Sequence, residues 1–94
     1  MTLTEARKEI DALDEQIIPL LEKRMRAAVL CGAEKKKAGM PLRDEKREAE
    51  VLCRAEQMTE PPFCAAIRHV YSALFDACVS LERTRTYERF ISGY

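Results

Sequence analysis

The chain has 94 residues, enough for one domain, and its 16 basic and 16 acidic side chains leave no net charge. With 47% apolar and 34% charged residues it has the composition of a soluble helical domain, and its neutrality argues against a general nucleic-acid binder. No stretch approaches the roughly 20 apolar residues of a membrane span, and the first twenty residues lack the apolar block of a signal peptide. We expect one domain over residues 1–94, located in the cytoplasm, with no nucleic-acid or membrane partner.

The first predicted helix begins near Thr2 and ends at the loop-forming residues Gly39-Met40-Pro41. Thr2 and Glu5 fit a capping box, and Pro19 predicts a kink because proline removes a backbone hydrogen bond. One bent helix of this length spans about 50 Å, which no other part of so small a chain covers, so we expect a partner chain to cover it. The helix carries a stripe with a 3.5-residue period: Leu3, Ala6, Ile10, Leu13, Ile17, Leu20, Arg24, Ala27 and Cys31.

Two further helices are predicted. The second extends from about Asp44, a suitable N-cap, to about Met58. Thr59-Glu60-Pro61-Pro62 then breaks the chain and starts the third helix, which should end before Gly93. The order long, short, long, without a strand pattern, predicts an all-α fold with three helices per chain and no second domain. The third helix has the apolar stripe Phe63, Ile67, Val70, Tyr71, Leu74, Cys78 and Leu81.

The four cysteines, at positions 31, 53, 64 and 78, show no CxxC spacing, and His69 is the single histidine. A zinc site is therefore not expected, and we predict no metal and no cofactor. Small reduced thiols in core positions agree with a cytoplasmic protein.

Charged residues occupy inward-facing positions in all three predicted helices. Arg24 falls in the apolar register of the first helix, and Glu48 and Glu82 lie on the apolar faces of the second and third. Lys35 points almost the same way as Arg24, because eleven residues make three helical turns. Several unrelated buried charges are costly in a small core. A polar pocket for a small anion with more than one carboxylate explains them together, since guanidinium groups match carboxylates.

Each charge also has an ordinary explanation. Arg24 can extend to solvent or join an ion pair, and Lys35 belongs to a charged run typical of a solvated face. The others can lie at the surface or pair locally: Arg47 and Glu48 on the second helix, Arg7 with Asp11, and Glu82 with Arg83 or Arg85.

Two segments are specific as an ordered set when they occur with Arg7 and Lys35: IDALDEQIIPLLEKR, from Ile10 to Arg24, and PLRDEKRE, from Pro41 to Glu48. With this set the sequence resembles the all-helical class of chorismate mutase, over nearly the whole chain. The resemblance implies an intertwined helical-bundle homodimer that converts chorismate to prephenate, by a Claisen rearrangement, in the biosynthesis of Phe and Tyr. This unimolecular step needs no nucleophile, metal or cofactor. The enzyme must hold a compact substrate conformer and stabilise the charge that grows on the ether oxygen.

The resemblance also implies a role for each site residue. Arg7, Arg24 and Lys35 hold the two carboxylates of chorismate and Arg47 supports them; Lys35 and Glu82 reach the ether oxygen; Asp44 and Glu48 hold the ring hydroxyl; Cys78 lies near a carboxylate and Cys31 at an apolar wall.

Three residues depart from the usual pattern of that family. Pro19 replaces an ordinary helix former, Cys78 a serine, and Glu82 the glutamine usual in bacterial relatives. A thiol forms weaker hydrogen bonds than a hydroxyl, and a glutamate donates to the ether oxygen only when protonated. We therefore expect turnover to rise as the pH falls. Burial and substrate carboxylates raise the pKa of Glu82 and neighbouring cations lower it, and the sequence leaves this balance open.

Arg7 and Arg24 are 17 residues apart, about 26 Å along one helix. If both bind one substrate molecule, Arg7 must come from a second chain, which predicts a homodimer with two equivalent sites. Two alternatives share these residues. One is an isochorismate-pyruvate lyase, against which the intact PLRDEKRE segment argues. The other is a non-catalytic helical dimerisation module, in which the charges set register and partner choice.

Overall fold

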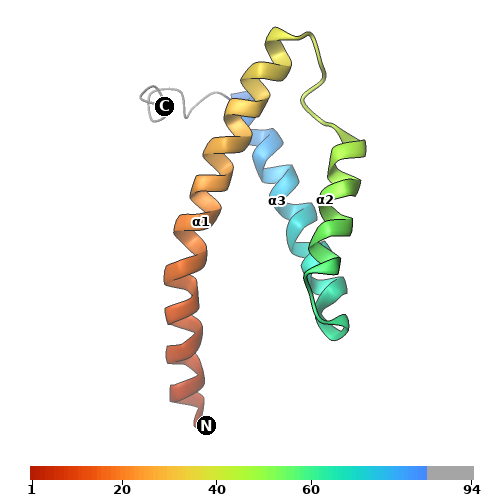
Figure 1. The fold of residues 1–94 in the computed structure, drawn as a ribbon. Helices are drawn as coiled ribbons and strands as arrows, with labels where there is room; N and C mark the ends of the chain where they lie inside the picture. Colours follow the sequence, from red (N-terminus) through yellow and green to blue (C-terminus); the bar gives the residue numbers. More distant parts are fainter. Residues whose placement is uncertain (85–94) are drawn as a thin grey trace.

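The computed structural model of the protein describes residues 1–84, which form three α-helices and one short 3-10 turn without strands (Figure 1). For these residues the predicted all-α class and the order long, short, long are confirmed. No helix within this range is both long and apolar enough to cross a membrane. The predicted helix end before Gly93 lies outside the described residues, as does Arg85. The elements are α1 (Leu3–Lys37), α2 (Glu45–Gln57), η1 (Pro61–Phe63) and α3 (Cys64–Thr84).

Local sequence signals fix the start of α1 and of α2. Thr2 is the N-cap of α1, where its hydroxyl oxygen accepts a hydrogen bond from the Glu5 amide at 3.1 Å. Asp44 is the N-cap of α2, where its carboxylate accepts one from the Arg47 amide at 3.0 Å. Both caps were predicted. Pro19 lies inside α1, which continues through it as one helix.

The end of α1 is set by Gly39, whose φ of 71° is a left-handed conformation that favours glycine. The amides of Gly39 and Met40 donate to the carbonyl oxygens of Lys36 and Lys35, at 3.1 and 2.8 Å. This is a Schellman motif, which satisfies the last carbonyl groups of a helix. It turns the chain from α1 into the loop that leads to α2.

The core is built around α3, which packs against both α1 and α2. Leu74 and Cys78 of the predicted α3 stripe are buried, and so is Val51, one turn after Glu48 on α2. At the C-terminal end of α1 the buried positions are Val29 and Gly32, which lie outside the predicted stripe. The reason is that α1 presents this second face to α3, while Ala27 and Cys31 of the predicted stripe line an open space between α1 and α2.

The N-terminal half of α1 extends beyond α2 and α3 (Figure 1). Its predicted apolar stripe is exposed within the described chain: Leu3 at 66%, Ile10 at 56%, Leu13 at 53%, Ile17 at 47% and Leu20 at 64%. No part of residues 1–84 covers this stripe. Contiguous apolar surface of this kind is typical of an interaction site.

Replacing Leu74 of α3 by Ala should lower the free energy of unfolding by about 2–4 kcal/mol, because this side chain is only 6% exposed and forms part of the core. Replacing the exposed His69, also on α3, by Ala should change it by less than about 0.5 kcal/mol. Urea unfolding of both variants measures the difference. Equal small losses would contradict a core centred on α3.

Candidate active site

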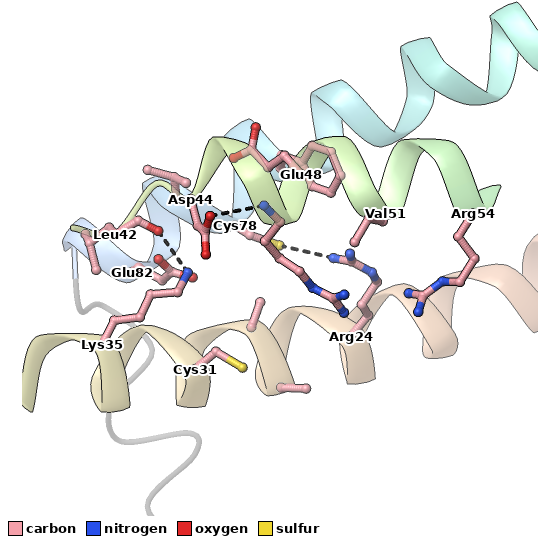
Figure 2. Close-up of a pocket in the computed structure, with 15 residues that line it drawn as sticks. Arg24, Cys31, Lys35, Leu42, Asp44, Glu48, Val51, Arg54, Cys78 and Glu82 are labelled. Atoms are coloured by element: carbon pink, nitrogen blue, oxygen red, sulfur yellow. Dashed lines mark hydrogen bonds between the residues drawn. The ribbon is translucent and has the colours of Figure 1, made fainter. Parts of the chain in front are cut away.

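A pocket of about 320 Å³ lies between α1 and α2, and α3 contributes its inner wall (Figure 2). Its volume falls at the lower end of the range for small-molecule sites, about 300–1,000 Å³. Arg7 is absent from the pocket, because it lies on the exposed N-terminal half of α1. The other seven predicted site residues line it: Arg24, Lys35, Asp44, Arg47, Glu48, Cys78 and Glu82.

Arg24 is held by α3. Its guanidinium carbon lies 5.5 Å from the ring centroid of Tyr71 and 5.9 Å from that of Phe75, and both rings attract a cation. Its Nη1 lies 4.0 Å from the Cys78 sulfur. Within residues 1–84 Arg24 forms no ion pair with a carboxylate. The guanidinium is therefore oriented without being neutralised.

Lys35 closes the other end of the pocket. Its Nζ donates a hydrogen bond to the Leu42 carbonyl oxygen at 2.9 Å, which ties α1 to the loop before α2. Figure 2 shows Lys35 and Glu82 pointing into the same space from α1 and α3. The side chain of Lys35 is thus fixed in place by a neutral partner and keeps its positive charge available.

Glu82 is 9% exposed, and its Oε2 has no hydrogen-bond partner among the described residues. Burial raises the pKa of this carboxyl above its ordinary value, and the charge of Lys35 only partly opposes the shift. The balance between burial and neighbouring cations, which the sequence left open, is therefore a net rise in the pKa of Glu82. The inward position of Glu82 is confirmed, and no ion pair with Arg83 forms within residues 1–84.

Cys78 is 5% exposed, and burial raises the pKa of its thiol, with the charge of Arg24 acting in the opposite direction. A protonated thiol can donate a weak hydrogen bond to an anion. All four cysteines are free. Among residues 1–84 no three His, Cys, Asp or Glu side chains are grouped as metal ligands would be.

Asp44 and Glu48, both expected to hold a hydroxyl, differ in orientation. Figure 2 shows Asp44 directed into the space between α1 and α2, whereas the Glu48 carboxylate lies on the side of α2 away from Arg24. Glu48 accepts a hydrogen bond from Arg43 at 3.3 Å, and Arg43 also donates to Asp76 of α3 at 2.7 Å. This link was not predicted from the sequence. Arg43 stood within the PLRDEKRE segment, but its pairing depends on how α3 packs.

Arg54 is a second pocket residue that was not predicted from the sequence. It lines the pocket together with Val51, and Figure 2 shows its side chain reaching from α2 toward α1. Its spacing of seven residues from Arg47, two turns on one helix face, could have identified it. Arg47 pairs with Glu50 at 3.6 Å, while Arg54 has no ion pair within residues 1–84. Positive charge therefore exceeds negative charge around this pocket, which favours an anionic ligand.

The fold and the pocket define the class: a small all-helical protein whose positively charged pocket suits an anionic small molecule. The chain belongs to the chorismate mutase type II family, a family of isomerase enzymes, whose sequence model matches residues 6–83. The resemblance noted in the sequence is thereby confirmed.

A curated relative is the bifunctional chorismate mutase/prephenate dehydratase of Aquifex aeolicus (strain VF5). It is 35% identical over 86 residues, which cover 86% of this chain and 24% of the relative. The chain thus spans about a quarter of the length of that protein. The comparison with solved structures gave no match.

Cys78 should react with iodoacetamide at least about tenfold more slowly than the exposed Cys53 at neutral pH, because Cys78 is buried and its raised pKa lowers the thiolate fraction. The rate at Cys78 should rise with pH. Peptide mapping by mass spectrometry after timed labelling measures both rates. Equal rates at the two positions would contradict the buried, protonated thiol.

Proposed function

We propose that the protein converts chorismate to prephenate in the biosynthesis of Phe and Tyr. The observation that carries the proposal is the convergence of seven predicted site residues, from three helices and one loop, on a single pocket. Membership in the chorismate mutase type II family supports it. The reaction is an intramolecular rearrangement, so the chain has to supply shape and charge rather than a reacting group.

The first requirement is to hold an extended dianion in a compact conformer. Arg24 and Lys35, three turns apart on one face of α1, bind the two carboxylates, and Arg47 supports them. The Cys78 thiol donates to a carboxylate near Arg24. Because Arg24 is already fixed against two aromatic rings, little side-chain freedom is lost when substrate binds. Preorganised positioning of this kind can supply a large part of a rate enhancement.

The second requirement is to stabilise negative charge on the ether oxygen as its bond to the ring breaks. Lys35 and protonated Glu82 donate hydrogen bonds to this oxygen. A single preorganised donor of this type is worth roughly 3–4 kcal/mol in other enzymes. The raised pKa of Glu82 extends the pH range in which it can donate.

The ring hydroxyl is bound by Asp44 and Glu48. Asp44 is directed into the pocket, while the Glu48 carboxylate contacts Arg43 at 3.3 Å. A carboxylate has about four acceptor positions, so Glu48 can accept from the substrate hydroxyl while it keeps one bond to Arg43. In this arrangement the hydrogen bond from Arg43 fixes the orientation of the Glu48 carboxylate.

The active unit is an intertwined homodimer, in which the partner chain covers the exposed stripe of α1 and contributes its Arg7 to the pocket. Two observations support this assembly: five apolar side chains of the stripe are 47–66% exposed, and Arg7 lies about 26 Å along α1 from Arg24. A cytoplasmic location, expected from the free cysteines, stays a prediction.

Incubation of the purified protein with chorismate, and separately with isochorismate, tests the proposal. We expect prephenate from chorismate and no pyruvate from isochorismate. Pyruvate from isochorismate would favour the lyase, and turnover of neither compound would favour a non-catalytic dimerisation module.

Refolding a 1:1 mixture of Arg7→Ala and Arg24→Ala chains should restore about a quarter of wild-type turnover. Half of the dimers are then mixed, and one of the two sites in each mixed dimer keeps both arginines. Each variant refolded alone is the control and should be nearly inactive. Chain exchange without any recovery of turnover would contradict a site shared between chains.

Glu82→Gln should flatten the pH profile of turnover and raise activity near neutral pH. The amide donates at any ordinary pH, whereas Glu82 donates only when protonated, so wild-type activity should fall as pH rises through its raised pKa. Steady-state kinetics from pH 5 to pH 8 measure both profiles. Identical profiles would show that Glu82 does not contact the ether oxygen.

A further inference from the structure

Gly32 of α1 lies directly against the side chain of Glu82. A Cβ atom added at Gly32 would lie 2.7 Å from Cγ, 2.8 Å from Cδ and 3.1 Å from Oε2 of Glu82. Carbon atoms in contact are ordinarily about 3.5–4.0 Å apart. A side chain at position 32 and the Glu82 side chain in its present position therefore exclude each other.

The backbone gives no other reason for glycine at this position. Gly32 lies inside α1, five residues before Lys37, and the positive φ in the described chain belongs to Gly39. Glycine in a helix interior is roughly fivefold less favourable than alanine in the helix–coil equilibrium. The close approach of Glu82 accounts for a residue that otherwise weakens the helix.

We infer that Gly32 is a positioning residue for the proposed reaction: its missing side chain lets the Glu82 carboxyl lie against α1 beside Lys35, where the ether oxygen would bind. The reaction assigned to this position rests on the proposed function. The contact between Gly32 and Glu82 does not depend on it.

Displacement of Glu82 would change both its geometry and its titration. Burial, opposed by the charge of Lys35, raises the pKa of Glu82. A methyl group at position 32 would push the carboxyl out of this buried place, so its pKa should fall and the donor would leave the ether oxygen. The titratable and charged groups that line the pocket around Glu82 are Arg24, Cys31 and Lys35 from α1, Asp44, Arg47, Glu48 and Arg54 from the loop and α2, and Cys78 from α3.

A double-mutant cycle tests the contact without any assay of turnover. Urea unfolding is compared for wild type, Gly32→Ala, Glu82→Ala and the double variant at equal protein concentration. In the Glu82→Ala background, Gly32→Ala should raise the folding equilibrium constant roughly fivefold, because alanine is the better helix former. With Glu82 present this gain should be absent or reversed. Equal effects in both backgrounds would overturn the inference.

If Gly32→Ala fails to fold, the folding of the double variant Gly32→Ala/Glu82→Ala tests the contact instead. Recovery of folding when Glu82→Ala is added supports the contact, and failure of the double variant to fold overturns it.

Two further measurements separate positioning from a general loss of stability. The Glu82 carboxyl carbon, followed by NMR in labelled protein, should titrate at lower pH in Gly32→Ala than in wild type. At acidic pH, where Glu82 is protonated and acts as the donor, turnover of chorismate by Gly32→Ala should fall by about 100-fold. Ala33→Gly, at the next and exposed position of α1, is the matched control and should leave both the titration and the turnover unchanged.

An unchanged Glu82 titration together with unchanged turnover in Gly32→Ala would overturn the inference and leave the proposed function standing. Absence of turnover in wild type would count against the proposed function instead, and the unfolding cycle and the titration would still decide whether Gly32 positions Glu82.

Discussion

Burial of the Glu82 carboxyl is the constraint on which the rest of the site depends. A buried oxygen without a hydrogen-bond partner costs free energy, and Oε2 of Glu82 is in that position. The fold meets this cost in three ways. Burial raises the pKa of the carboxyl, which widens the pH range in which it is uncharged; Lys35 lies nearby as a cation; and Gly32 leaves the space in which the side chain lies. A polar group kept in this way is pre-oriented for a ligand and contributes little to the stability of the free protein.

The cations of the pocket are likewise held in place by uncharged groups. Arg24 is held by aromatic rings and Lys35 by a backbone carbonyl, so neither is neutralised by a carboxylate of residues 1–84. Fixed, unneutralised cations repel one another, and a dianion that binds between them relieves this repulsion. A bound dianion should accordingly stabilise the fold as well as be held by it. One structural element, α3, fixes Arg24 and carries Glu82, which couples the packing of the core to the electrostatics of the site.

Local signals explain what the sequence could predict. Thr2 and Asp44 cap their helices as expected, because a cap is decided by residues within one turn. Arg24, Lys35, Glu48 and Glu82 were visible as inward-facing charges in the helical periodicity. Asp44, Arg47 and Cys78 were expected at the site only from the family resemblance. Features set by packing between helices were not predicted: the buried α1 face of Val29 and Gly32, which meets α3 at Glu82, and the bridge from Arg43 to Glu48 and Asp76. Gly32 belongs to this second group, since its role appears only when α3 is placed against it.

We propose that Glu82 and the cations of two chains surround one small dianion. A crystal structure of the protein with a stable bicyclic dicarboxylate that mimics the transition state is the decisive measurement. We expect two equivalent sites per dimer, with Arg24 and the partner's Arg7 on carboxylates of the ligand, and Glu82 and Lys35 on its ether oxygen. A ligand bound by one chain alone, or with its ether oxygen away from Glu82, would contradict this arrangement.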